Sequence, residues 1–383
     1  MPAIYLDNAA TSFPKPPAVA DAMRRYLTEV GASVNRGVYA SAQDAGLTAL
    51  LLRENLCQLF HHDDPTRCVF TAGNTMGLNM ILRGWLKPGD HCLVSAMEHN
   101  AVMRPLQDLA ARGVAFDRVP CDSQGFLDME ALRRMIRPNT RLVMLNHASN
   151  VGGGVQDAAA VGKICREAGV PFALDAAQTA GHWDIDFQGW GLAALSVPGH
   201  KGLMGPSGIG ALLLAPEFAQ NLTPILSGGT GSASDSEIQP DYLPDKFESG
   251  TLNLPGIYGL HAAVAFVLET GVETLRQHET ALTKRFLEHL REVPNIRVAG
   301  PLTTENRVGV VSVDFLEQDN ADAAFRLEND FGIYTRCGLH CAPSAHKTLG
   351  TFPQGTVRFS FGWFSSPSDV DSAAAAVAAI AAR

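Results

Sequence analysis

Four short segments of the sequence carry side chains whose types and spacing could do chemistry. Three follow a short apolar run and a fourth is rich in turn-forming residues: 70–77, 171–175, 196–202 and 336–343. Apolar runs of this kind are typical of strands buried on both faces of a parallel sheet. Because ligands bind beyond the carboxyl ends of the strands in open α/β sheets, the polar residues that end these runs are the first candidates for a functional site.

The first segment, residues 70–77, could bind phosphate. A strand would end near Thr71, and a helix would begin near Thr75. Helix N-termini present free backbone N–H groups and a partial positive charge, so this segment is a candidate phosphate site. The spacing does not match a P-loop, and an ordinary helix N-cap is the alternative interpretation.

The second and third segments could supply a carboxylate and a nucleophilic amine. Asp175 ends an apolar run, and a buried carboxylate there needs a cationic partner. A protonated pyridine nitrogen is one such partner, while a salt bridge or a helix cap is the alternative. Lys201 lies in a turn of small residues, where desolvation and nearby cations would lower its pKa and make it a nucleophile.

The fourth segment places a thiol beside basic side chains. Cys341 follows His340 and lies five residues after Arg336, surroundings that favour the reactive thiolate. A small buried hydrophobe is the alternative reading of this cysteine. A metal site built from Cys337, His340, Cys341 and His346 fits no common zinc spacing, so no metal is expected.

The composition indicates an acidic globular protein. The 383 residues suit two or three lobes, and the formal net charge of −9, with no basic run, excludes a general nucleic-acid role. The seven cysteines include no C-x-x-C pair, so they predict reduced thiols and a cytoplasmic location. We find neither a signal-peptide pattern nor the ~18 apolar residues that cross a bilayer, and expect no membrane contact.

The elements that must position these residues alternate between strand and helix up to about residue 260. Strands are expected at 68–70, 91–96, 141–146, 170–174, 193–197 and 209–214, and helices at 75–86, 101–112 and 157–168. This alternation predicts a mostly parallel sheet covered by helices. Residues 216–255 are rich in Gly, Ser and Pro, and we interpret them as an ordered functional loop or a dimer arm, with a disordered linker as the alternative.

The pattern changes near the C-terminus to a smaller α+β lobe. Two successive helices are expected at 257–269 and 272–291. They precede strands at 296–298, 308–314 and 356–361 that mix with helices at 320–330 and 368–382. The chain thus predicts two lobes of unequal size.

In this order, the segments resemble the class V aminotransferase superfamily, and within it the type II cysteine desulfurases and selenocysteine lyases. The resemblance runs from Tyr5-Leu6-Asp7-Asn8-Ala9-Ala10-Thr11 to Val357-Arg358-Phe359-Ser360, and the series Asp175…Gln178…His200-Lys201 is its most specific part. It implies the α/β type I fold of PLP-dependent transferases. A large domain at 16–260 would hold a mostly parallel seven-stranded sheet covered by helices, and residues 1–15 and 261–383 would form a small α+β domain.

The resemblance implies pyridoxal 5'-phosphate (PLP) as the cofactor, bound as a Schiff base to Lys201. Lys201 would also move the Cα proton of the substrate, Asp175 would pair with the pyridine nitrogen, and His99 would stack on the ring. The other implied cofactor contacts are Gln178 and Asn150 at the ring hydroxyl, Asn74, Thr75 and His200 at the phosphate, and Thr251 from the second subunit of a homodimer. The implied substrate-binding residues are Asn8, Ala10, Arg36, Arg336 and Arg358, of which Arg358 would grip the carboxylate.

Cys341 matches the persulfide-forming cysteine of the R-x-G-x-H-C motif, which spans Arg336 to Cys341 here. The implied activity converts L-cysteine to L-alanine, with sulfur passing to Cys341 and then to an acceptor protein or a small thiol. The alternatives are a lyase acting on L-selenocysteine, a C–S β-lyase that yields pyruvate, and a non-catalytic scaffold with the same fold.

Two positions depart from the family pattern. Pro198 stands where these enzymes have a serine that holds the phosphate, and proline offers neither a hydroxyl nor an N–H. Ser196 is a candidate replacement, although it lies two residues away. Cys337 could resolve a persulfide on Cys341 into a disulfide or could pack against the protein, and we favour packing.

Overall fold

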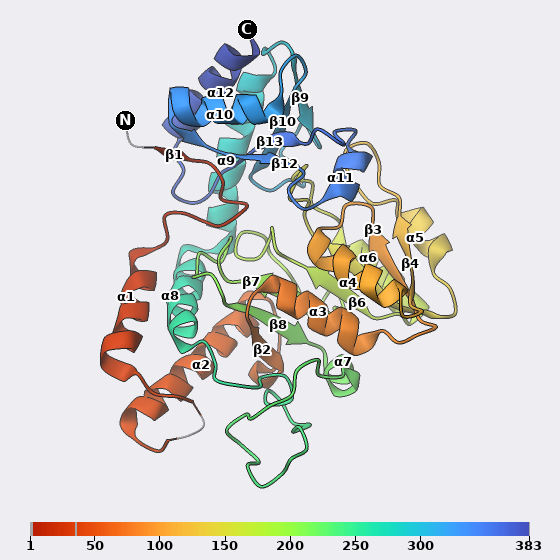
Figure 1. The fold of residues 1–383 in the computed structure, drawn as a ribbon, viewed down its shortest axis with the longest axis vertical. Helices are drawn as coiled ribbons and strands as arrows, with labels where there is room; N and C mark the ends of the chain where they lie inside the picture. The colour runs from red at the N-terminus through yellow and green to blue at the C-terminus, as the bar shows by residue number, and fades with distance from the viewer. Residues whose placement is uncertain (1–2, 35–36, 383) are drawn as a thin grey trace.

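The computed structural model describes residues 3–34 and 37–382 and divides into a large and a small lobe (Figure 1). The large lobe is built on a seven-stranded sheet in the order β2-β8-β7-β6-β5-β3-β4. Its strands are β2 (Cys68–Thr71), β3 (His91–Ser95), β4 (Ala115–Val119), β5 (Thr140–Asn146), β6 (Phe172–Asp175), β7 (Ala194–Pro198) and β8 (Gly210–Leu214). Only β8 runs antiparallel to its neighbours, so the mostly parallel sheet predicted from the sequence is confirmed.

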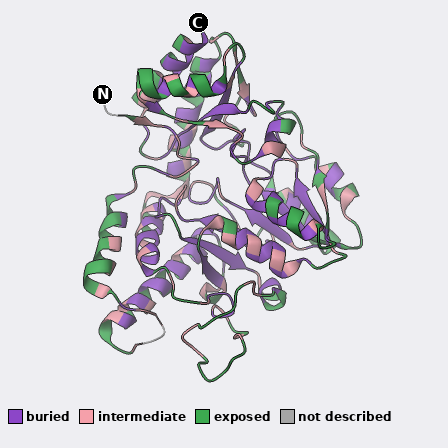
Figure 2. Ribbon diagram, in the orientation of Figure 1, coloured by how far each residue is buried: buried purple, intermediate pink, exposed green. Residues whose placement is uncertain are grey.

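Helices cover both faces of this sheet, which is why its strands are apolar on both sides (Figure 2). Alternate residues of one strand belong to different cores, as Leu174 and Ala173 of β6 show. One face carries α2 (Ala40–Leu59), α5 (Met129–Met135), α6 (Ala158–Ala168) and α8 (Leu254–Thr270). The other carries α3 (Asn74–Trp85), α4 (Asn100–Ala110) and α7 (Pro216–Asn221).

The remaining parts of the large lobe lie at its periphery. Helix α1 (Pro17–Arg25) packs on α8 and continues into a π-helical turn, η1 (Tyr26–Val30), while η2 (Pro65–Arg67) is a short 3₁₀ turn before β2. Residues 222–253 contain no helix or strand and project as a long loop, drawn in green in Figure 1. The buried ion pair between Arg53 and Glu248, with an N–O distance of 2.7 Å, fixes the end of this loop to α2.

The small lobe is built on an antiparallel sheet in the order β12-β13-β10-β9. Its strands are β9 (Ile296–Ala299), β10 (Val310–Phe315), β12 (Arg336–Gly338) and β13 (Thr356–Ser360), and its helices are α10 (Asn320–Phe331), α11 (Pro343–Thr348) and α12 (Pro367–Ala381). The N-terminal strand β1 (Ile4–Tyr5) pairs with β11 (Ile333–Tyr334), so both ends of the chain meet in this lobe.

Helix α9 (Val272–Leu290) joins the two lobes. Leu275, in its first turn, packs in the core of the large lobe, whereas Leu282 and Phe286 pack in the core of the small lobe. Helix α8 continues to Thr270, and its residues Val264 and Val267 belong to the large-lobe core. One continuous helix therefore spans the junction.

Two kinds of feature are absent from the described residues. No helix among residues 3–34 and 37–382 is long and apolar enough to cross a membrane. Within the same described residues, no three His, Cys, Asp or Glu side chains cluster as a metal site would require.

Candidate active site

A cavity of about 780 Å³, including its mouth, opens where β5, β6 and β7 end. Its volume lies in the range of pockets that hold small ligands. The structure brings most of the predicted cofactor-binding residues to this cavity, namely Asn74, Thr75, His99, Asn150, Asp175, Gln178, His200 and Lys201.

Asp175 lies at the floor of the cavity, at the end of β6. Its Oδ1 accepts hydrogen bonds from Asn74 Nδ2 at 2.7 Å and from the Ala177 N–H at 2.9 Å. No hydrogen bond among the described residues uses Oδ2. Burial raises the pKa of this carboxyl, while Asn74, Ala177 and the Lys201 cation oppose the rise. The free oxygen is therefore available to a cationic ligand group.

Lys201 lies in the turn that follows β7. Burial, followed by the Arg358 cation, lowers its pKa to about 8, as predicted for a nucleophilic amine. The preceding carbonyl, of His200, accepts hydrogen bonds from the Ser12 N–H at 3.0 Å, Thr11 Oγ1 at 3.1 Å and Lys15 Nζ at 3.2 Å. The N-terminal segment therefore fixes the peptide that leads into Lys201.

His99 caps the N-terminus of α4 and lines the cavity. Its Nδ1 accepts the Ala101 N–H at 3.0 Å, which places the proton of the neutral ring on Nε2. Burial, and then the Lys201 cation, lower its pKa to about 4, so the ring is neutral near pH 7. A flat neutral imidazole at this position suits stacking on an aromatic ligand.

One end of the cavity can hold an anion. Gly73 adopts φ = 125°, and a Cβ built there would meet no atom within 4 Å, so the backbone is open where α3 begins. The N–H groups of Asn74 and Thr75 make no hydrogen bond within the described residues. His200 lies beside them, and its buried Nδ1 has no partner. This helix N-terminus supports the predicted phosphate site.

The side chain of Asn74 does not point to the predicted phosphate site, because other residues bind it. Asn74 donates to Asp175, and its Oδ1 accepts the Ser196 hydroxyl at 2.7 Å. Only the Asn74 backbone is left for a phosphate. Ser196 is fully buried, so it does not substitute for the hydroxyl that Pro198 lacks.

Ser207 is a cavity residue that the sequence reasoning missed. It is exposed, lines the cavity beside Pro198 and His200, and makes no hydrogen bond within the described residues. The signal that could have revealed it is the small, polar Gly205-Pro206-Ser207-Gly208 turn shortly after Lys201.

Gln178 and Asn150 border the cavity on the side of the small lobe. Gln178 Nε2 donates to the Ala9 carbonyl at 3.1 Å. Asn150 Nδ2 donates to the His340 carbonyl at 2.7 Å, and its Oδ1 is buried without a partner. Both residues therefore connect the cavity to small-lobe segments.

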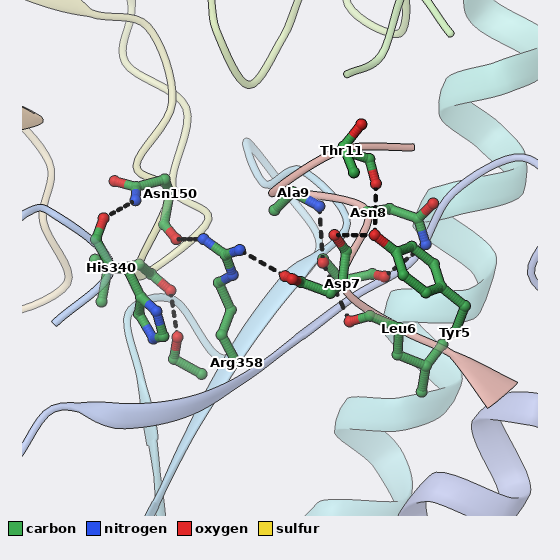
Figure 3. A network of polar contacts seen from close by, with 12 residues as sticks. Tyr5, Leu6, Asp7, Asn8, Ala9, Thr11, Asn150, His340 and Arg358 are labelled. Carbon is green, nitrogen blue, oxygen red and sulfur yellow. Dashed lines mark hydrogen bonds and ion pairs between the residues drawn. The ribbon is translucent and has the colours of Figure 1, made fainter. Parts of the chain in front are cut away.

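Arg358, on β13, is held in a network that Figure 3 shows from close by. Its Nη2 lies 2.8 Å from Asp7 Oδ1, and its Nη1 donates to the Asn150 carbonyl at 3.2 Å. The guanidinium is buried, and its Nε has no partner. Asp7 lies inside the N-terminal motif, yet the sequence reasoning selected its neighbours Asn8 and Ala10 instead.

The other predicted substrate-binding residues are scattered around this network. Arg336 pairs in register with Arg358 on the neighbouring strand and is exposed. Asn8 lines a second, adjoining cavity that also borders Lys201 and Gln178. The Ala10 N–H donates to the Asp7 carbonyl at 3.0 Å. Arg36 lies outside the described residues.

Thr251 does not reach the cavity within one chain. It is exposed and lines a separate cavity with Ser249 and Leu226. Its predicted contact with the phosphate of a second subunit stays a prediction.

Cys341 lies on the surface, in a turn between β12 and α11. Cys341 and His340 adopt φ = 57° and 49°, a left-handed conformation that costs non-glycine residues energy. The Cys341 carbonyl accepts the Asn100 N–H at 2.7 Å, which anchors the turn next to His99. By contrast, Cys337 packs against the small-lobe core, where burial raises the pKa of its thiol.

This chain has relatives that match it over almost its whole length. The chain matches the Aminotransferase class-V family over residues 4–372. A probable cysteine desulfurase of Methanothermobacter thermautotrophicus is 31% identical over 372 residues, which cover 96% of this chain and 92% of that protein. The cysteine desulfurase of Cronobacter sakazakii is 32% identical over 378 residues, 97% of this chain and 91% of the relative.

Solved structures share the fold over almost the whole chain. The apo structure of the cysteine desulfurase from Thermococcus onnurineus NA1 has a TM-score of 0.93 at 32% identity and covers 99% of this chain and 95% of that one. The cysteine desulfurase CsdA (S-sulfonic acid) of Escherichia coli has a TM-score of 0.87 at 30% identity and covers 98% and 94%. The fold predicted from the sequence is confirmed, and the chain belongs to the class V aminotransferase family.

Proposed function

We propose that this protein is a PLP-dependent cysteine desulfurase that converts L-cysteine to L-alanine and passes the sulfur through Cys341 to an acceptor. The observation that carries the proposal is the junction of two sites. A buried cavity holds Lys201, Asp175 and His99, and an exposed thiol is anchored next to His99 by the Asn100–Cys341 hydrogen bond. Class V aminotransferases are PLP enzymes, and the related proteins are named cysteine desulfurases.

The residues of the cavity fit PLP. The open α3 N-terminus, the unpartnered His200 Nδ1 and the Ser207 hydroxyl suit its phosphate. Asp175 Oδ2 suits its pyridine nitrogen, and the unpartnered Asn150 Oδ1 can accept a hydrogen bond from the ring hydroxyl. Each polar group of the cofactor thus has a group here that otherwise lacks a partner.

When bound, PLP supplies an electron sink that stabilises negative charge at the Cα of an amino acid. The chain's own residues do the rest. The Asp175 carboxylate keeps the pyridine nitrogen protonated, and His99 holds the ring face. The Lys201 amine, with its pKa near 8, takes the Cα proton and can return it.

Arg358 binds the substrate carboxylate in this proposal. Its Nε is unpartnered, and its Nη2 is paired with Asp7 in the ligand-free chain. A planar guanidinium can present two N–H groups to a carboxylate, so the free Nε side supports substrate binding while Asp7 orients the group.

The Cys341 thiolate then attacks the substrate sulfur. The bond between Cys341 Sγ and that sulfur forms as the Cβ–S bond breaks, and the electron pair passes to the three-carbon product. Protonation of that product gives alanine, and a thiol of the acceptor removes the sulfur from the enzyme. Because Cys341 is exposed, an acceptor protein or a small thiol can reach it.

We further propose that the enzyme is a homodimer, with Thr251 of one subunit completing the phosphate site of the other. Thr251 is exposed and lies outside the cavity of its own chain, which supports a contact made between chains. Analytical ultracentrifugation tests the dimer, and a Thr251→Ala variant with weaker PLP binding would support the shared site.

A product assay tests the function. Purified protein is incubated with PLP, L-cysteine and a reductant, and alanine, pyruvate and sulfide are quantified together. Equal amounts of alanine and sulfide are expected. Pyruvate in place of alanine would indicate a C–S β-lyase, and turnover of L-selenocysteine alone would indicate a selenocysteine lyase.

A further inference from the structure

A buried ion pair connects the two lobes directly behind the Lys201 turn. His182 follows β6 in the large lobe, and Glu279 lies on α9, which runs into the small lobe. His182 Nδ1 lies 2.7 Å from Glu279 Oε2, and the side chains are only 13% and 11% exposed. The hydrogen-bond angle is bent, but a distance of 2.7 Å between opposite charges makes the contact an ion pair.

The surroundings of the His182 ring require a proton on each nitrogen. Nε2 lies 2.7 Å from the Gln178 carbonyl, and Nδ1 faces the Glu279 carboxylate. Both partners are acceptors, so only the imidazolium satisfies them together. Burial lowers the pKa of His182, but the charge and the hydrogen bond of Glu279 outweigh it and leave the pKa raised. His147 is another titratable group near this ring, and it is neutral because burial and the His182 charge lower its pKa to about 3.

His182 also packs against the backbone next to Lys201. A Cβ built on Gly202 would meet His182 Cε1 and Nε2 at 3.4 Å and the Ala180 carbonyl at 2.4 Å. A Cβ on Gly181 would meet the Gly202 carbonyl at 2.4 Å. Residues 180–182 therefore lie against the Lys201 turn, with no space for a side chain on Gly181 or Gly202.

Glu279 also lies close to the small-lobe residue Gly309. Its Oε2 lies 3.3 Å from a Cβ built on Gly309, immediately before β10. The same pair borders the second cavity, which Lys201, Asn8 and Trp363 also line. The ion pair is thus placed between the cofactor-binding turns and the lobe that carries Arg358 and Cys341.

We propose that His182 is a positioning residue of the cofactor site, and that its pairing with Glu279 couples the docking of the small lobe to the placement of Lys201 and Gln178. This inference rests on the proposed PLP-dependent function. His182 contacts the Gln178 carbonyl through one nitrogen and Glu279 of the lobe-joining helix α9 through the other, while its ring lies next to Gly202. Its effect reaches the reaction only through these neighbours.

Two substitutions separate the two halves of the pair. Glu279→Gln removes the charge but leaves a neutral His182 that can still donate Nε2–H to Gln178. His182→Gln removes the ring, the charge and the contact with Gly202. We expect His182→Gln to weaken PLP binding on the order of tenfold, and Glu279→Gln to weaken it by less. His182→Lys restores a cation opposite Glu279 and should recover part of the loss.

The experiment measures PLP affinity by reconstituting the apoprotein, and follows by absorbance the pH midpoint of the Lys201-linked cofactor band. Glu288→Gln replaces an exposed carboxylate on the same helix α9, so it is the matched control and should behave as wild type.

A lower PLP affinity and a displaced pH midpoint in His182→Gln, with partial recovery in His182→Lys, would support the proposal. The proposal would be overturned if both His182→Gln and Glu279→Gln kept the wild-type PLP affinity and the wild-type pH midpoint of the cofactor band. Lower melting temperatures alone would not rescue it. If His182→Gln does not fold, Glu279→Gln against Glu288→Gln decides in the same way. Wild-type protein that takes up no PLP would instead refute the proposed function.

Discussion

The turns that carry Lys201 and Cys341 differ in nearly every physical respect. Lys201 follows a central strand of a sheet covered on both faces, and burial lowers the pKa of its amine to about 8. Cys341 lies on the surface of the small lobe, in a turn where it and His340 both adopt a left-handed conformation. In the proposed reaction, the proton moves within the protein, whereas the sulfur must leave it. The difference teaches that each group has the exposure its task requires.

Lys201→Ala breaks the buried half of this comparison. We expect turnover of L-cysteine to fall by roughly 1,000-fold or more, because the proton at Cα then has no base. Steady-state assays at saturating L-cysteine measure the loss, and circular dichroism checks the fold. Lys163→Ala, an exposed lysine on α6, is the control, and equal activity in Lys201→Ala and this control would contradict the assignment.

Cys341→Ala breaks the exposed half alone. Sulfur transfer from L-cysteine should fall by at least about 100-fold because the step loses its nucleophile, whereas the cofactor spectrum should stay unchanged. Sulfide release and absorbance are measured on the same sample.

Cys337→Ala is the matched thiol control for that experiment. Cys337 is partly buried against the small-lobe core and lies outside the exposed turn, so activity should persist with some loss of stability. Loss of sulfur transfer in Cys337→Ala with a normal melting temperature would instead support a resolving role for this thiol.

The pH dependence of cofactor uptake tests whether the pKa of the buried Lys201 amine is lowered. Only the unprotonated Lys201 amine can attack PLP, so the rate should rise about tenfold per pH unit up to a midpoint near 8. A lysine with its ordinary pKa of 10.5 would keep rising well beyond that pH. Borohydride trapping at a series of pH values measures the rate, and a midpoint near 10.5 would show that the amine is not desolvated.

Arg358→Lys tests the proposed contact with the substrate carboxylate. The ammonium cannot reproduce the fork that contacts Asp7 and the Asn150 carbonyl, so KM for L-cysteine should rise about tenfold with a smaller change in kcat. Arg297→Lys, an exposed arginine on β9, is the control. An unchanged KM would remove Arg358 from the substrate site.

Ser207→Ala has the smallest expected effect. If its hydroxyl replaces the one that Pro198 lacks, PLP affinity should fall roughly two- to tenfold, the cost of one hydrogen bond. Titration of the apoprotein with PLP measures it. A double variant that combines Pro198→Ser with Ser207→Ala should regain PLP affinity if both positions contact the same phosphate.

The sequence predicted the elements of the sheet better than the details of the site. The runs ending at Thr71, Asp175 and Pro198 are strands because they are apolar on both sides, and that pattern is visible without a structure. The helix at Ala40–Leu59 and the edge strand at Ala115–Val119 were missed. The strand alternates weakly in burial, and the helix is apolar around much of its surface.

Side-chain partners across long separations could not be predicted. Asn74 was expected at the phosphate, but Asp175 and Ser196, both more than 100 residues away, take its side chain. Asp7 pairs with Arg358 across 351 residues, and Glu279 meets His182 only because α9 crosses between lobes. Such contacts follow from tertiary packing, which cannot be predicted from the local pattern of residues in the sequence.

The pairing of Asp7 with Ser360, and of β1 with β11, has a consequence for folding during synthesis. During synthesis, Asp7 leaves the ribosome long before its partner Ser360 has been made. The large sheet, complete by Leu214, can fold early, as domains do during translation. Cys341 and Arg358 are synthesised after this sheet, so in the proposed reaction a shorter nascent chain has neither the thiol that accepts sulfur nor the substrate-binding guanidinium. The proposed sulfur transfer is thereby withheld until the small-lobe residues up to Arg358 have been synthesised.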